Sequence, residues 1–67
     1  MKYYIKERYN PQIGTVYYPY GRMSKKAAKR YESPLYGDNT MHSFDTYQQY
    51  LDEIDRLKES GEEVYTK

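Results

Sequence analysis

The scarcity of branched aliphatic side chains most constrains what this chain can fold into. Only eight of its 67 residues are Ile, Leu or Val, whereas eleven are tyrosine. A domain of this size is close to the lower limit at which packing alone sustains a fold. Because the sequence has no cysteine, neither a disulfide nor a thiolate metal site can reinforce it. Tyrosine must therefore supply much of the buried area, with each hydroxyl group at the surface or hydrogen-bonded.

The first twenty positions predict a β-hairpin. Residues 2–9 (KYYIKERY) alternate between two faces, a period of two that is typical of a strand. The following NPQIG segment has turn chemistry, and residues 15–18 would form the returning strand. Pro19 cannot donate a backbone hydrogen bond, so this strand should end there or lie at a sheet edge. We expect an antiparallel hairpin over residues 2–18.

The alternation also divides the hairpin into two faces. We expect one face to join the core through Tyr3, Ile5, Val16 and Tyr18. The other face would then expose Tyr4, Lys6, Arg8 and Tyr17.

Two helices are expected. Ser24 is a good N-cap for a short helix near residues 24–33, which Pro34 would stop. Thr46 and Gln49 have the spacing of a capping box at the start of a longer amphipathic helix near residues 46–60. Short strands at 40–44 and 62–66 are possible additions. The expected architecture is a single α+β domain over residues 1–67, with both helices on one face of a small sheet.

Charge is distributed unevenly along the chain. Residues 1–31 hold eight Lys and Arg against one acid, a net +7, and residues 32–67 hold three against nine acids, a net −6. Such asymmetry indicates interaction surfaces of opposite sign. The alternative is that the two halves attract each other within the fold.

A basic and aromatic surface is the first candidate site. It comprises the exposed face of the hairpin and the cations that follow: Tyr4, Lys6, Arg8, Tyr17, Arg22, Lys25, Lys26, Lys29 and Arg30. Lys25 and Lys26 fall in a first helical turn, where the helix dipole disfavours cations, and this favours an anionic partner. Aromatic rings between cations suit nucleic acid. They equally suit a protein interface, so the residue types leave both open.

An acidic helix face is the second candidate site. Asp52, Asp55 and Glu59 are spaced three and four residues apart, which places them on one stripe of the longer helix. This stripe is either a solvated face or a negative ridge that fits a basic groove, as a mimic of a nucleic-acid backbone would.

Catalytic chemistry is not expected from this sequence. The sequence contains no phosphate-binding loop, nucleophile elbow or metal-ligand pair at usable spacing. Its single histidine, His42, is near Asp38 and Asp45 in the chain. We therefore expect no enzyme activity, no cofactor and no metal. No apolar run approaches the roughly 20 residues of a membrane span, and the opening residues lack the pattern of a signal peptide. We expect no membrane partner and a cytoplasmic protein.

The chain resembles, in overall character, the small inhibitor proteins that phages and other mobile elements encode, among them the anti-CRISPR proteins. The resemblance rests on brevity, the lack of cysteine, an MKYYIKER-type strand, and an acidic helix, TYQQYLDEIDRLKESG, after a basic one, SKKAAKRYE. It covers the whole chain but includes no diagnostic motif, so no residue role is carried over. It implies a non-enzymatic inhibitor, acting in the host cytoplasm, that blocks a nucleic-acid-binding or regulatory site of a larger host protein or nucleoprotein complex.

Two further partners are expected as alternatives. One is nucleic acid itself, bound by the basic and aromatic surface in an accessory role. The other is a second copy of the chain, in a twofold homodimer that pairs the basic segment of each copy with the acidic helix of the other. Against the dimer stands a monomer whose charges pair internally.

Overall fold

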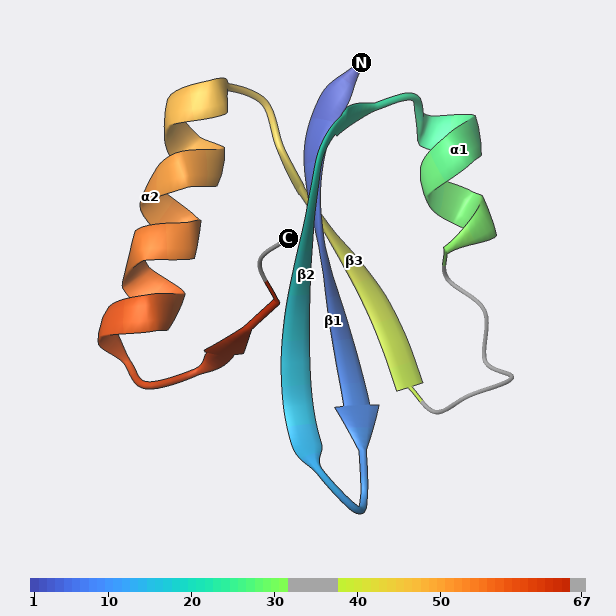
Figure 1. Ribbon diagram of the computed structural model, residues 1–67. Coiled ribbons are helices and arrows are strands. Elements are labelled where there is room, and N and C mark those ends of the chain that lie inside the picture. Colours follow the sequence, from blue (N-terminus) through green and yellow to red (C-terminus); the bar gives the residue numbers. More distant parts are fainter. Residues whose placement is uncertain (32–37, 66–67) are drawn as a thin grey trace.

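The computed structural model describes residues 1–31 and 38–65. In chain order its elements are β1 (Lys2–Asn10), β2 (Gly14–Met23), α1 (Lys25–Arg30), β3 (Asp38–Phe44), α2 (Tyr47–Glu59) and β4 (Glu63–Val64). The strands form one mixed sheet in the order β3-β1-β2-β4, in which β1 is antiparallel to both neighbours and β4 is parallel to β2 (Figure 1). The expected α+β fold with an N-terminal hairpin is confirmed.

The hairpin turn forms as the NPQIG segment predicts. The Ile13 amide donates to the Asn10 carbonyl at 3.2 Å, and the Gln12 amide donates to the Asn10 side chain at 2.9 Å. Gly14 follows with φ of 88°, a left-handed conformation that glycine adopts without strain. Asn10 therefore pairs with Gly14, and a three-residue loop lies between the strands.

The second strand is longer than expected, because a bulge carries it past Pro19. Tyr4 pairs with Gly21 and Ile5 pairs with Pro19, so Tyr20 is an extra residue on β2. Gly21, with φ of 77°, accommodates the bulge. Beyond it β2 continues to Met23. β4 pairs only with Val16 and Tyr17, so Pro19 lies on a stretch with no outer neighbour in the described sheet, as the edge alternative predicted.

The first helix is shorter than the expected span of 24–33. The Ser24 hydroxyl accepts from the Ala27 amide at 3.2 Å, which confirms the N-cap. The helix ends at Arg30, with Tyr31 as its C-cap. Residues 32 and 33 of the expected span lie outside the described residues.

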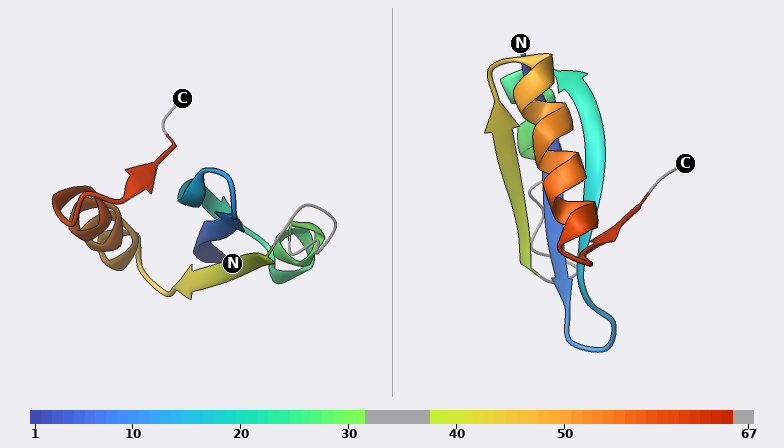
Figure 2. Two further views of the ribbon diagram at one scale, coloured as in Figure 1. Left: turned by 90° about the horizontal axis from the view of Figure 1, so that it is seen from below. Right: turned by 90° about the vertical axis from the view of Figure 1, so that its left-hand side faces the viewer.

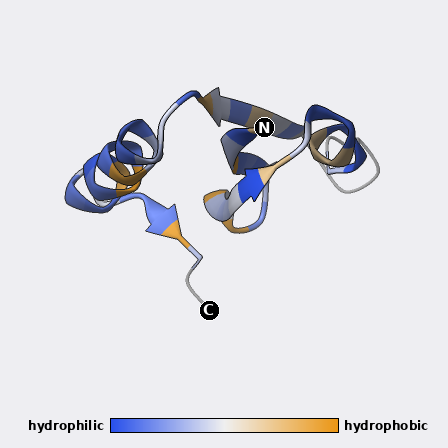
Figure 3. Ribbon diagram, turned by 90° about the horizontal axis from the view of Figure 1, so that it is seen from above, coloured by the Kyte–Doolittle hydropathy of each residue, from blue (hydrophilic) through white to orange (hydrophobic). Residues whose placement is uncertain are grey.

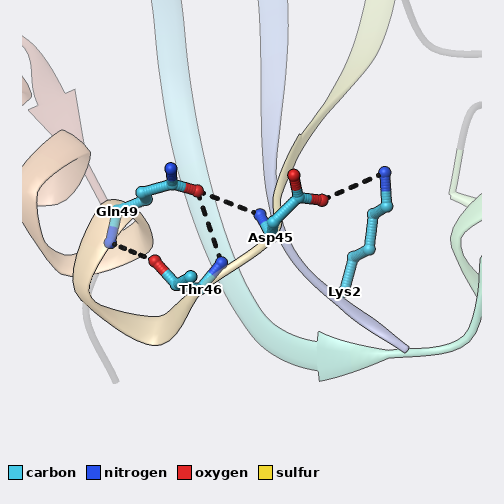
Figure 4. A network of polar contacts seen from close by, with 4 residues as sticks. All are labelled: Lys2, Asp45, Thr46 and Gln49. Atoms are coloured by element: carbon cyan, nitrogen blue, oxygen red, sulfur yellow. Dashed lines mark hydrogen bonds and ion pairs between the residues drawn. The ribbon is translucent and has the colours of Figure 1, made fainter.

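The second helix matches its expectation closely. The Gln49 side-chain oxygen accepts from the Thr46 amide at 3.3 Å, and the Thr46 hydroxyl accepts from the Gln49 amide at 3.2 Å, so both halves of the capping box form (Figure 4). The same Gln49 oxygen also accepts from the Asp45 amide at 3.2 Å.

The two additional short strands also form. β3 begins two residues before the expected 40–44 segment, and β4 covers only Glu63–Val64 of the expected 62–66 segment, of which residue 66 is not described.

The expectation that both helices cover one face of the sheet is wrong. In the right-hand view of Figure 2, α2 lies in front of the sheet and α1 lies behind it. Tyr4 and Ile5 explain why two covers are needed. They are consecutive on the central strand β1, so their side chains point to opposite faces, yet both are buried, with exposures of 6% and 1%.

Chain topology imposes the same arrangement. β2, β3 and β4 run in one direction, so the connections through α1 and α2 are crossovers between parallel strands. The first crosses the sheet from β2 to β3, and the second returns from β3 to β4. Crossovers of this kind are almost always right-handed. Since these two run across the sheet in opposite senses, both are right-handed only when their helices lie on opposite faces (Figure 2).

The core is small and contains two tyrosines. Among the described residues the buried hydrophobic side chains are Tyr4, Ile5, Ala28, Tyr50 and Leu57. In Figure 3 most of α2 is coloured hydrophilic, and its hydrophobic turns lie on the side nearer the sheet. The expectation that tyrosine helps to build the core therefore holds for Tyr4 and Tyr50.

Candidate interaction surfaces

The predicted basic and aromatic surface of the hairpin does not exist as one surface. Lys6 pairs with Tyr18 and Glu7 pairs with Tyr17 across β1 and β2. Paired residues share a face, so Tyr17 lies opposite to Lys6 and faces α2. Tyr4 is on the face of Lys6 but is buried. The prediction was wrong because the three-residue turn places odd-numbered residues of β1 beside odd-numbered residues of β2, as in the Glu7–Tyr17 pair. The expected faces had instead placed odd-numbered residues of one strand beside even-numbered residues of the other.

The predicted cations of α1 do form an exposed group. Lys25, Lys26, Lys29 and Arg30 are all exposed and, within the described parts of the chain, form no ion pair. The first turn of α1 contains no acidic residue to complement the helix dipole. Arg22, predicted to extend this group, is exposed but pairs with Tyr3, which packs against α2. The structure therefore places Arg22 on the face opposite to α1.

Lys6 lies among three tyrosine rings on the α1 side of the sheet. Its amine is 5.2 Å from the centre of the Tyr18 ring, 5.5 Å from that of Tyr20 and 6.0 Å from that of Tyr31. These distances fit cation–π attraction, which is stronger for a half-buried lysine than for a fully solvated one. Arg8, two residues further along the same face, is half-buried.

The rings around Lys6 belong to a larger group, which we call the tyrosine cluster: Tyr18, Tyr20, Tyr31 and Tyr65. Tyr20 and Tyr31 have ring centres 4.7 Å apart, and Tyr18 and Tyr65 have ring centres 5.4 Å apart. The sequence-based prediction of the surface missed all four. The length of the turn was the clue, because a three-residue loop sets Tyr18 beside Lys6.

The predicted acidic stripe is present on α2. Asp52, Asp55 and Glu59 are exposed, while Tyr50 and Leu57 on the other side of the helix are buried. Within the described residues none of the three carboxylates forms an ion pair, although Asp52 accepts a hydrogen bond from Gln48 at 2.8 Å. We call Asp52, Asp55 and Glu59 the acidic stripe.

Two cations of α2 adjoin the acidic stripe in sequence, Arg56 beside Asp55 and Lys58 beside Glu59, and Arg56 is already engaged. Arg56 donates from Nε and Nη2 to the two carboxylate oxygens of Glu53, each at 2.6 Å. This hydrogen bonding holds the pKa of the Glu53 carboxyl below its ordinary value, and burial opposes the shift. Arg56 therefore neutralises Glu53 rather than the acidic stripe, and the three carboxylates of the stripe outnumber Lys58, which is exposed and forms no ion pair in the described residues.

Beneath α2 lies a group of polar residues. Burial raises the pKa of the Tyr17 hydroxyl above its ordinary value, and the Glu7 and Glu62 carboxylates add to the rise. The Glu7 carboxylate is 2.8 Å from Nε2 of His42. The expected neighbours of His42 were Asp38 and Asp45, but its observed polar partner is Glu7, with which it shares the face of the sheet that α2 covers.

One ion pair joins the basic and acidic halves. The Lys2 amine is 3.2 Å from the Asp45 carboxylate, and both side chains are largely exposed (Figure 4). Across residues 1–31 and 38–65, no other ion pair links a Lys or Arg of the first half to an acid of the second. The sheet separates the cations of α1 from the acidic stripe, so these two charged surfaces do not neutralise each other within one chain.

The same separation bears on self-association. A twofold dimer that pairs α1 of each copy with α2 of the other needs both helices on one side of the molecule. Because they lie on opposite faces, any contact between unlike charges of two copies would instead be head-to-tail.

Neither a metal-binding cluster nor a membrane-spanning helix occurs in the described residues. Over residues 1–31 and 38–65, no three His, Cys, Asp or Glu side chains gather where they would hold a metal ion. Among the same residues, neither helix has the length and apolar character needed to span a bilayer.

Comparison of the chain with family models, with curated proteins and with solved structures found no match.

Proposed function

We propose that this protein is a non-enzymatic binding protein that docks on a basic surface of a larger protein through the acidic stripe of α2. One observation carries the proposal: three exposed carboxylates of one sign lie in line on a rigid helix, without an ion pair in the described structure. A net negative field of this kind speeds encounter with a basic partner and disfavours acidic ones.

The main competing interpretation is a helix face that merely keeps the protein soluble. A helix face that only keeps the protein soluble does not need charges of one sign, because interspersed positive and negative charges have the same effect. Here Arg56 is held by Glu53, the cations of α1 are behind the sheet, and Lys58 alone offsets the three carboxylates. The capping box fixes the start of α2, and the buried Tyr50 and Leu57 fix its rotation. The acidic stripe is therefore presented in a fixed orientation, which supports recognition.

The resemblance to small phage and mobile-element inhibitors supplies the proposed consequence of docking. The acidic stripe would occupy a groove in a host protein or nucleoprotein complex, such as a CRISPR or other defence complex, where phosphates otherwise bind. Blocking such a groove requires no catalytic group.

The test is affinity capture from host extract with two charge-matched variants. Asp52→Lys with Asp55→Lys reverses two of the three charges of the acidic stripe, whereas Glu62→Lys with Glu63→Lys makes the same change in net charge at two exposed positions at the start of β4. Mass spectrometry identifies the captured partner. Added nucleic acid tests whether the partner is captured through a groove that binds nucleic acid. We expect capture of a nucleic-acid-binding protein by the wild type and by the Glu62/Glu63 variant, and loss with the Asp52/Asp55 variant.

Circular dichroism of each variant ensures that the folded proteins are compared. Equal capture by both variants, or capture that nucleic acid does not compete away, would rule out docking through the acidic stripe.

A further inference from the structure

We infer that the opposite face carries a second binding surface, on which the tyrosine cluster and the adjacent cations of α1 hold single-stranded nucleic acid. This surface replaces the hairpin surface expected from the sequence, since Tyr17 and the buried Tyr4 take no part in it. It uses none of the residues of the acidic stripe, so it stands independently of the docking proposal.

The tyrosine cluster has fixed inner rings and open outer rings. Tyr18 and Tyr20 are half-buried on β2 and share the Lys6 amine. Tyr31 packs on Tyr20 and is 43% exposed, and Tyr65 packs on Tyr18 and is 53% exposed. Each outer ring is therefore held by an inner ring while much of its surface faces solvent. Such preorganisation lowers the entropic cost of placing a base against it.

Cations lie beside Tyr31, one of the two open rings. Lys29 and Arg30 immediately precede Tyr31 at the end of α1, and both are exposed without an ion pair in the described residues. Lys6 adds its charge at the centre of the cluster. Glu63 pairs with Val16 and so lies on the same face, at the β4 edge. A nucleic-acid strand whose phosphates follow these cations would therefore bind most strongly on the side of Tyr31.

Single-stranded nucleic acid is the partner that uses both features. Aromatic rings stack on bases, while lysine and arginine neutralise phosphates. In a duplex the base faces are already stacked on one another and cannot reach Tyr31 or Tyr65. An acidic peptide would engage the cations of α1, but its carboxylates offer no aromatic face for the rings to stack on.

Binding is measured by the fluorescence anisotropy of a labelled oligothymidine of about ten nucleotides, with a duplex of equal length alongside. At about 50 mM salt we expect the single strand to bind more tightly than the duplex. Tyr31→Leu and Tyr65→Leu should each weaken its binding by roughly 5-fold to 150-fold.

The chain supplies matched controls on the other face. Tyr9 is 44% exposed on β1, and Tyr47 is 55% exposed on α2, where its ring packs on Tyr3. Tyr9→Leu and Tyr47→Leu should leave the affinity unchanged. Lys29→Gln and Arg30→Gln should each reduce the slope of log affinity against log salt by about 0.7, whereas Lys58→Gln on α2 should not alter it.

Several results would overturn the inference: no binding at low salt, equal binding of single strand and duplex, or equal loss in the Tyr31 and Tyr9 variants. Binding of an acidic peptide in preference to the oligonucleotide would assign the surface to a protein partner instead. The docking proposal can fail separately, because the Tyr31 and Tyr65 variants leave the acidic stripe intact.

Discussion

Lys6 and Tyr18 pair across β1 and β2, and the Lys6 amine lies 5.2 Å from the centre of the Tyr18 ring. This relationship follows from the three-residue turn at the hairpin tip, which sets the register of the two strands. It brings a charge from the central strand into the tyrosine cluster and gives that cluster its fixed centre.

We expect Lys6→Met to lower the free energy of unfolding by about 0.5 to 2 kcal/mol, because it keeps an unbranched apolar side chain but removes the charge that attracts three rings. Urea denaturation measures the change. Lys29→Met, at an exposed position on α1, is the control and should change stability by less than about 0.5 kcal/mol. Equal stability of the Lys6 variant and the wild type would show that the charge contributes nothing.

Gly21 should be the least replaceable residue of the bulge. Its φ of 77° is strained for any residue with a Cβ, although a Cβ there would meet no atom within 4 Å. We expect Gly21→Ala to destabilise the protein by about 1 to 2 kcal/mol through backbone strain alone. Gly21→Asn should cost less, because asparagine tolerates this conformation. If alanine and asparagine cost the same, strain is not the cause.

Alkaline pH should destabilise the protein through Tyr17. Because burial and the neighbouring carboxylates raise its pKa above the ordinary value of 10.0, the unfolded chain loses this proton first. The stabilising contribution is complete below pH 10.0 and is lost as the pH rises through the pKa of the folded state.

We therefore expect Tyr17→Phe to lose stability above pH 10.0 less steeply than the wild type, by up to about 1.4 kcal/mol per pH unit. Glu7→Gln removes one of the charges that raise the pKa and should give an intermediate curve. Denaturant midpoints across this range provide the measurement, and parallel curves for all three proteins would refute the assignment.

Reversing Lys25 and Lys26 to Glu should preserve or raise stability, by at most about 1 kcal/mol for each residue, because acids suit the first turn of a helix. Lys29→Glu with Arg30→Glu is the matched control in the last turn and should lower stability for the opposite reason. The Lys25/Lys26 variant should also bind anionic partners more weakly. Reduced stability with unchanged binding would instead give these lysines an intramolecular role.

Self-association should be weak, salt-sensitive and open-ended. The cations of α1 and the acidic stripe lie on opposite faces, so unlike charges of two copies meet head-to-tail, and such contacts extend without closing unless they form a ring. In sedimentation at low salt we expect the average mass to keep rising with concentration, and to return to about the 8.2 kDa of one chain at high salt.

A plateau at twice the mass of one chain would favour the twofold dimer considered from the sequence. A single-chain mass at low and high salt alike would exclude both modes of association.

Local chemistry was predictable where it depends on neighbours in the chain. The Thr46–Gln49 capping box, the Ser24 N-cap and the NPQIG turn all form as expected, because each is closed by hydrogen bonds within a few residues. The acidic stripe was also predictable, since helical spacing alone places its three residues together.

Burial in β1 and the pairing beyond the hairpin turn were decided only by the tertiary structure. Alternation in β1 separates its residues into two sets, but it does not say which residues are buried, and a central strand covered on both sides buries a residue of each set. Tyr4 was expected at the surface for this reason and is buried beside Ile5. The bulge at Tyr20 depends on the fit of β2 to β1 and has no signature in Pro19 or Gly21 alone.

Strand order decided the rest. From sequence, β3 and β4 were two short segments of unknown position, and their placement at opposite edges of the sheet is a long-range outcome. Once they are there, two right-handed crossovers must place α1 and α2 on opposite faces. The sequence by itself determined that the chain has a basic half and an acidic half. Only the fold determined that a sheet separates the cations of α1 from the acidic stripe, so that both charged surfaces stay exposed.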